Sequence, residues 1–223
     1  MRASRRRRLP PGRAARDMPA GSPPPPPQDM RPKVLQVQEA EGSAAMLSAF
    51  AAAEKGGASG IRLVTWNDYS EGTEWAPSSV TRHAYYDLAA WAIASFKAGK
   101  PPRIERDGFV VFHRRQIFNP ADTSRGQPWK VQSRAPVTNV VDTVAFLTAP
   151  ATLTVTVGGV GTSRKLSAGM QRLTVPARIG SVTVRLTRSG RTLAACTSPW
   201  TIAAKAARHD PLYAGFSSLR GCN

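Results

Sequence analysis

Residues 64–74 hold the side chains of this sequence that are best suited to chemistry. They read Val-Thr-Trp-Asn-Asp-Tyr-Ser-Glu-Gly-Thr-Glu, an apolar start followed by a polar stretch. Trp66 offers a flat apolar face on which a sugar ring could stack. Groups that could bond sugar hydroxyls follow directly after it, at Asn67, Asp68, Tyr69 and Glu71. The segment therefore indicates a surface able to hold a carbohydrate.

Asp68 and Glu71 also form a pair of carboxylates close together in the sequence. Glycosidases commonly use two carboxyl groups, and the distance between them decides whether the sugar configuration is retained or inverted. Spacing along a loop does not fix that distance, so a catalytic role for either residue is a hypothesis. In the structural alternative, Asp68 caps the loop and Glu71 pairs with a nearby arginine such as Arg82.

Other reactive residue types give weaker signals. The histidines His83, His113 and His209 are isolated, and no two of them have the spacing of metal ligands. Ser78 and Ser79 lack the Gly-x-Ser-x-Gly context of a hydrolase nucleophile. We predict neither a metal site nor a bound cofactor.

The elements that must position the polar segment alternate between strand and helix patterns over residues 31–118. We expect a strand at 34–37, a helix after Ser43, a buried strand at 61–66, a helix after Ser78 or Ser79, and a strand at 108–113. This order is typical of parallel strands joined by crossover helices. In a parallel α/β barrel, ligands bind at the carboxyl ends of the strands, which is where the polar loop would lie.

The pattern changes after Pro120. Threonine alternates with apolar residues at 151–157, and further strand candidates lie at 140–147, 171–175, 181–187 and 191–196. Several short strands separated by glycine turns are typical of an antiparallel β-sandwich. The predicted fold is thus α/β plus all-β, with a β-sandwich over residues 119–223.

Charge and low apolar content set the N-terminal residues 1–30 apart. The chain carries a net charge of +17, and these residues include Arg5 to Arg8 and Pro23 to Pro27. Little there can be buried, so we predict a disordered arm. Such charge could attract an anionic polymer, yet no nucleic-acid-binding motif accompanies it. The arginines lead into prolines rather than an apolar run, so no signal peptide is visible, and no membrane span is expected.

Cys196 and Cys222 are the only cysteines. In an exported protein they could join the C-terminal tail to the last strand region. Spacing alone does not show whether they are bridged.

Three stretches resemble glycoside hydrolase family 71, the α-1,3-glucanases. The segment VTWNDYSEGTEWAPSS is similar to the family's Thr-Trp-Asn-Asp-Tyr-x-Glu loop near the end of its catalytic barrel. YYDLAAWAIASFKAGKPPRIERDGFVVFHRR resembles the next helix, Lys-x-Gly turn and basic strand, and RPKVLQVQEAEGS resembles the preceding strand. The resemblance covers about residues 31–202.

The resemblance implies a secreted or periplasmic enzyme that hydrolyses α-1,3-glucan internally. Residues 31–118 would be the last βα units of a (β/α)8 barrel, and the β-sandwich would follow them. The glucan-binding residues would be Glu39, Trp66, Asn67, Asp68, Tyr69 and Glu71. The family's principal acid pair would lie on earlier strands that have no counterpart in this sequence.

A complete barrel needs about 250 residues, so we expect a truncated chain that is weakly active or inactive alone. Two other functions stay open. The sandwich could bind polysaccharide without cleaving it, or the basic arm could contact an anionic polymer. The oligomeric state is not indicated.

Overall fold

The computed structural model describes residues 35–124, 127–133, 136–205 and 210–222. The chain divides into two units, Met1–Pro32 and Lys33–Asn223, and all described residues belong to the second. The expected disordered arm at 1–30 and the candidate His209 lie outside the described residues.

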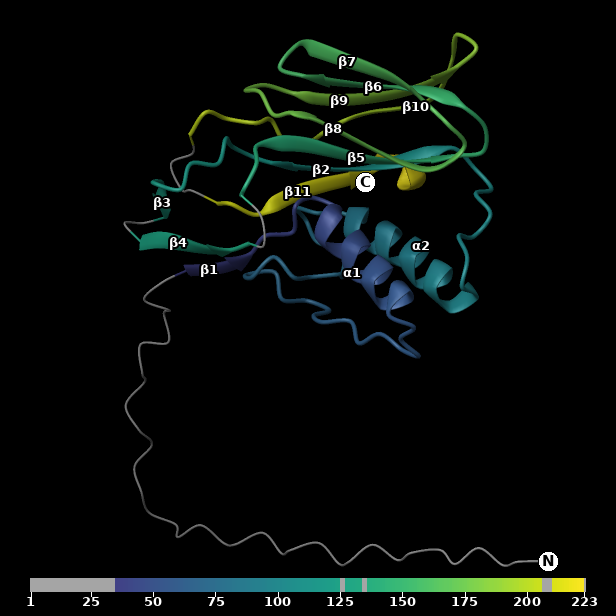
Figure 1. Ribbon diagram of the computed structural model, residues 1–223. Helices are drawn as coiled ribbons and strands as arrows, with labels where there is room; N and C mark the ends of the chain where they lie inside the picture. Colours follow the sequence, from purple (N-terminus) through teal and green to yellow (C-terminus); the bar gives the residue numbers. More distant parts are fainter. Residues whose placement is uncertain (1–34, 125–126, 134–135, 206–209, 223) are drawn as a thin grey trace, which may run out of the picture. The chain divides into compact units, whose positions relative to one another are not determined.

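One sheet has four antiparallel strands in the order β10-β9-β6-β7 (Figure 1). Its strands are β6 (Ala151–Val157), β7 (Val160–Leu166), β9 (Val182–Arg188) and β10 (Arg191–Thr197). Along β6 the apolar residues are buried and the threonines between them are half-buried. A strand with one covered face and one face toward solvent requires this alternation.

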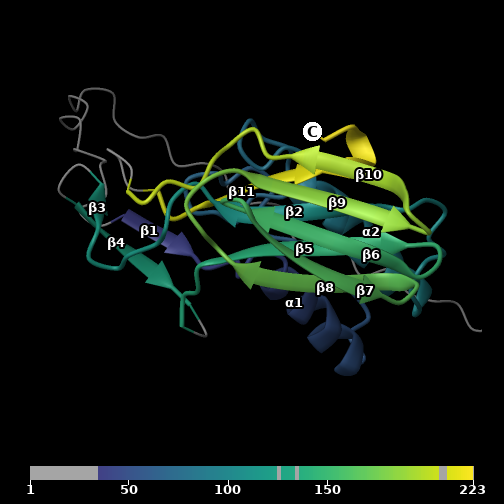
Figure 2. The same ribbon diagram turned by 90° about the horizontal axis from the view of Figure 1, so that it is seen from above.

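A second four-stranded sheet lies between the first sheet and the helices (Figures 1 and 2). In the order β11-β2-β5-β8, its strands are β11 (Tyr213–Ser217), β2 (Gly108–Arg114), β5 (Val140–Leu147) and β8 (Gly169–Pro176). Every residue of β2 is buried. Phe109 and Val111 enter the core shared with the first sheet, while Val110 and Phe112 enter the core shared with the helices.

Two helices cover the outer face of this middle sheet: α1 (Ala44–Lys55) and α2 (Ala84–Ala98). Tyr85 and Leu88 of α2 are buried against Val110 and Phe112. The start of α1 is fixed by Asp142 of β5, whose Oδ2 accepts bonds from the amide and hydroxyl of Ser43 at 2.7 and 2.6 Å. A short 3-10 helix, η1 (Ser218–Arg220), follows β11.

A small third sheet has the strand order β1-β4-β3. Its strands are β1 (Leu35–Gln38), β3 (Thr123–Ser124) and β4 (Gln127–Gln132). β1 pairs in parallel with β4, and β3 pairs antiparallel with β4. The end of β1 leads directly to Glu39.

The β-rich, largely antiparallel architecture expected after Pro120 is confirmed, but two expectations for residues 31–118 are wrong. Residues 61–66 form no strand, and Leu63 and Val64 are 42% and 57% exposed. β2 is antiparallel to both of its neighbours, β11 and β5, so it is not a strand of a parallel sheet. The parallel arrangement was predicted from the alternation of strand and helix patterns, but the partners of β2 come from after Pro120, and its apolar sequence fits burial on both faces in either arrangement. The structure does not confirm a barrel remnant.

The structure also decides two local questions, namely whether the cysteines are bridged and where the second helix begins. Cys196 and Cys222 are joined in a disulfide with a Cα–Cα distance of 5.6 Å, so the bridged alternative holds. The second helix begins at Ala84 rather than directly after Ser78 or Ser79. The Ser78 hydroxyl accepts bonds from the amides of Val80 and Thr81 instead, and so closes a turn before the helix.

None of the helices described here is both long and apolar enough to cross a membrane.

Candidate functional site

Residues 66–76 form a loop whose two ends are tied together by backbone hydrogen bonds. The carbonyl of Trp66 accepts bonds from the amides of Trp75 and Ala76 at 3.0 and 2.8 Å. Just before it, the amide of Thr65 donates to the carbonyl of Thr73 at 3.2 Å. We call residues 66–76 the polar loop. Its closure explains how an irregular segment can hold several side chains in fixed relative positions.

The polar loop rests on two neighbouring parts of the chain. The amide of Gln38 at the end of β1 donates to the carbonyl of Glu71 at 2.9 Å. Gly72 has a φ of +73°, and a Cβ there would lie 2.7 Å from Cδ2 of Leu212. Glycine is therefore required both by the left-handed backbone and by the close approach to Leu212.

Most of the predicted sugar-binding side chains of the loop are exposed. Trp66 is 60% exposed and Tyr69 43%, while Asn67 and Glu71 are also exposed. Asp68 is half-buried, and its Oδ1 accepts a bond from the Ser70 hydroxyl at 3.2 Å. The loop thus brings these predicted residues together on one short, solvent-facing segment.

The loop carboxyls Asp68, Glu71 and Glu74 have no ion-pair partner among the described residues. Arg82, the partner considered for Glu71, stacks over the ring of Trp200 at 5.4 Å. Most other described carboxylates are paired with a cation, namely Glu39, Asp87, Glu105, Asp107, Asp122, Asp142 and Asp210. In a chain with 31 lysines and arginines against 14 acidic residues, three unpaired carboxyls on one loop are unexpected. Of the three, Asp68 and Glu71 are at least partly accessible to solvent, whereas Glu74 is buried.

An apolar groove of about 280 Å³ lies beside the loop. It is lined by Leu63, Thr65, Trp66, Trp75, Tyr86, Ala89, Ala90 and Ile93. The rings of Trp66 and Tyr86 meet at 73°, with centroids 6.5 Å apart. Two aromatic walls at a steep angle can hold the apolar face and edge of a ring-shaped ligand.

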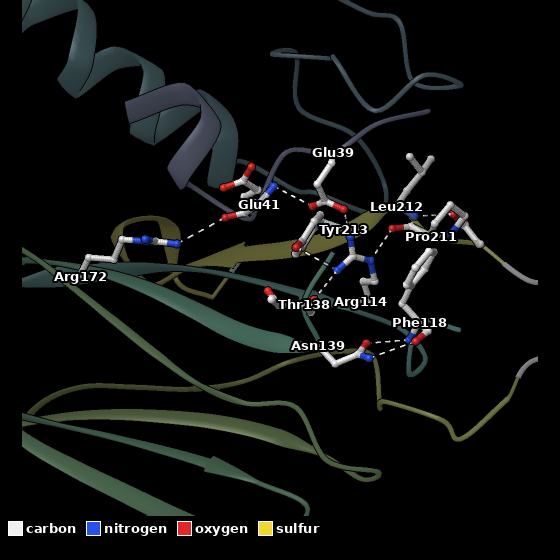
Figure 3. A network of polar contacts seen from close by, with 11 residues as sticks. Glu39, Glu41, Arg114, Phe118, Thr138, Asn139, Arg172, Pro211, Leu212 and Tyr213 are labelled. Carbon is white, nitrogen blue, oxygen red and sulfur yellow. Dashed lines mark hydrogen bonds and ion pairs between the residues drawn. The ribbon is translucent and has the colours of Figure 1, made fainter. Parts of the chain in front are cut away.

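Glu39 lies behind the loop in a buried polar network (Figure 3). Its carboxylate binds the guanidinium of Arg114, and the two side chains are only 2% and 4% exposed. Arg114 also donates to the Tyr213 hydroxyl at 2.9 Å and to the carbonyls of Pro211 and Thr138 at 2.8 and 3.0 Å. The sequence prediction of a sugar-facing Glu39 is therefore not matched by its position, since its carboxylate points inward to Arg114.

Glu74 is the loop residue with the most perturbed acidity. Its side chain turns inward and the residue is 8% exposed. Burial raises the pKa of this carboxyl to about 7, and the nearby negative charges of Asp68 and Asp210 add to the shift. A hydrogen bond from its own backbone amide opposes the shift but does not cancel it. Glu74 thus keeps its proton close to neutral pH.

Sequence reasoning missed Glu74, Tyr86 and Arg114. Tyr86 had a signal, because Tyr86, Ala89, Ala90 and Ile93 follow helical spacing along a second face of α2, next to the face that holds most of its buried residues. Glu74 and Arg114 had none, since their roles depend on segments that meet only in the fold. In the described part of the chain, no three acidic, histidine or cysteine side chains gather as metal ligands.

The polar loop and the aromatic groove both lie in a part of the chain that is similar to the glycosyl hydrolases. Residues 50–210, well over half of the chain, match the family model described as Glycosyl hydrolase family 71. The chain belongs to this family. No curated protein and no solved structure matches it.

Proposed function

We propose that this chain acts on α-1,3-glucan, with the polar loop and the aromatic groove holding the polysaccharide for internal hydrolysis. The observation that carries the proposal is the free, carboxyl-rich loop beside exposed Trp66, within the segment that matches a glycosyl hydrolase family. An aromatic face packs on the apolar side of a sugar, and carboxylates accept bonds from its hydroxyls.

The hydrolysis needs two carboxyl groups. One protonates the leaving glycosidic oxygen, and the other either takes a proton from water or bonds to the anomeric carbon. The candidates of this chain are half-buried Asp68 and exposed Glu71, and Asn67 and Tyr69 bind hydroxyls beside them. Glu39 contributes by holding the end of β1 behind the loop, because Arg114 occupies its carboxylate.

We propose further that residues 35–107 correspond to the last units of the family's barrel and act together with barrel strands not described here. Exposed Leu63 and Val64 support this, since apolar side chains beside a site are normally covered. The principal acid pair then comes from those strands, and the chain alone hydrolyses weakly or not at all. The disulfide suits a secreted or periplasmic protein, because disulfides persist in oxidising compartments.

Binding can be tested without hydrolysis. We expect an α-1,3-linked gluco-oligosaccharide to change the tryptophan fluorescence of the full chain. Trp66→Ala should weaken binding about tenfold, the equivalent of about 1.4 kcal/mol. Ile179→Ala is the matched control, because Ile179 is also 60% exposed but lies outside the groove.

Equal affinity in both variants would contradict the proposed site. Release of glucose oligomers from insoluble α-1,3-glucan tests the second part of the proposal. Efficient turnover by this chain alone would show that no further strands are needed.

A second candidate function is non-catalytic polysaccharide binding by the sandwich. It is favoured by the threonines of β6 and β9, which lie opposite one another in register as Thr152–Thr187 and Thr156–Thr183. Their hydroxyls form a regular row on the face turned from the core. If Thr156→Ala with Thr183→Ala releases the full chain from insoluble α-glucan and Trp66→Ala does not, the sandwich is the binding surface.

A further inference from the structure

The carboxyl of Glu74 occupies an unusual place beneath the polar loop. It lines a cavity of about 10 Å³, roughly the room of one water molecule. The cavity lies where the loop meets the end of β1, the start of α2 and the segment before β11, and its lining includes Glu39, Tyr85, Arg114, Leu212 and Tyr213. A sugar ring cannot enter a space of this size, so Glu74 does not contact substrate in this conformation.

Within the described part of the chain, no cation forms an ion pair with Glu74. Among the described residues, nothing donates a hydrogen bond to its Oε2. Arg114 directs its guanidinium to Glu39, Tyr213 and two backbone carbonyls. An ionised Glu74 would therefore be a buried and unpaired charge, which is costly.

The other groups facing Glu74 make ionisation harder. Asp68 of the same loop and Asp210 of the segment before β11 both act on it with negative charge. Glu39 at the end of β1 is a third carboxyl on the cavity, although Arg114 of β2 neutralises it. Tyr85 of α2 and Tyr213 of β11 complete the titratable lining, and the pKa of each is raised, so both stay neutral.

We infer that Glu74 is a positioning residue for the sugar-contacting loop, holding it against the sandwich when protonated and loosening it when ionised. The inference rests on the proposed function only in calling the loop sugar-contacting. Glu74 is connected to the groove through the backbone of the polar loop. Trp75, its neighbour in sequence, lines the groove and donates its amide to the carbonyl of Trp66 at 3.0 Å.

The direction of the pH effect follows from the two states of the loop. Glu74 has a pKa of about 7 in the closed loop and about 4.5 when released into water. The closed loop is fully favoured below the lower value and loses that preference as pH rises toward the upper one. Between pH 5 and 7 the opening equilibrium should increase about 40-fold and then level off.

Hydrogen exchange of the full chain tests this inference. After correction for the intrinsic pH dependence of exchange, amides of residues 66–76 should lose protection between pH 5 and 7, while β5 amides should not. Glu74→Gln keeps the shape without the charge and should make the profile flat. Glu105→Gln is the matched control, because this exposed carboxylate lies outside the cavity, and it should behave like wild type.

A flat wild-type profile, or the same pH trend in Glu74→Gln, would overturn the inference. The wild-type profile is informative even if the variant does not fold. Binding of an α-1,3-linked gluco-oligosaccharide is measured in parallel. Failure to bind at every pH would overturn the proposed function, whereas the exchange result would still decide the role of Glu74.

Discussion

The two-sheet sandwich and the segment from Ile61 to Ser78 differ in side-chain burial, in regular secondary structure and in the pairing of their charges. In the sandwich, large apolar residues such as Phe109 and Leu153 are completely buried. In the other segment, Trp66 is 60% exposed, no regular strand forms, and no described cation pairs with the carboxyls. The comparison indicates that the sandwich supplies the stability, while the loop segment keeps apolar and acidic side chains exposed, as the proposed binding role requires.

The comparison is tested most directly by truncating one apolar residue in each region. Phe216 of β11 is fully buried in the sandwich core, whereas Leu63 is 42% exposed. Phe216→Ala should lower the free energy of unfolding by about 3–5 kcal/mol, because it leaves a cavity. Leu63→Ala should lower it by less than about 0.5 kcal/mol. Urea denaturation measures both, and similar losses would mean that residues 61–66 are part of the stable core.

The ion pair of Glu39 and Arg114 ties the end of β1, on which the polar loop rests, to the sandwich, and it should give the next effect. Arg114→Met leaves the Glu39 carboxylate buried without a cationic partner, with the Glu41 amide still donating to it, and this should cost about 3–5 kcal/mol. Removing both charges with Glu39→Gln and Arg114→Met should recover part of this loss. Arg103→Met, at an exposed pair, should change stability by less than about 1 kcal/mol. If Arg114→Met behaves like Arg103→Met, the network in Figure 3 does not stabilise the attachment of β1 to the sandwich.

A smaller effect comes from pH, because one buried group in each region should make stability depend on pH with opposite sign. These groups are His113 in the sandwich and Glu74 in the loop segment. His113 in β2 is buried between the Arg114 carbonyl and the Ser198 hydroxyl, at 2.8 Å from each, and burial lowers its pKa. Its contribution to stability is present above the ordinary pKa of about 6.5 and is lost as pH falls, opposite to Glu74. His113→Gln should therefore reduce the acid-side loss of stability in urea titrations. If the loss of stability at acidic pH is the same in His113→Gln as in wild type, His113 is not its cause.

Patterns within single segments predicted much of this structure. Both helices, β2 and the strands β5, β6, β8, β9 and β10 were found near their observed positions, because each has an apolar side and glycine or polar ends. β7 was missed because this edge strand is largely exposed and its sequence, VGTSRKL, lacks an apolar alternation. β11 was missed because its five residues are stabilised by pairing with β2, a distant part of the chain.

For the candidate site, too, the sequence predicted what lies within one segment but not the contacts between segments. Trp66 and the polar residues after it are adjacent in sequence, so their grouping survives folding. The inward turn of Glu39 and of Glu74 depends on Arg114, Tyr213 and Leu212, which approach from other segments. The apparent strand at 61–66 failed for a related reason, since a short apolar run becomes a strand only where a partner strand is available.

The disulfide has a consequence for how the molecule would respond to damage. Cys196 belongs to β10, and Cys222 follows η1, which comes directly after the edge strand of the other sheet. A protease that cut the backbone once between these cysteines would leave both pieces covalently attached. They would migrate as one species on a denaturing gel until a thiol reductant was added, and the nicked protein would keep its last strand within reach of β2.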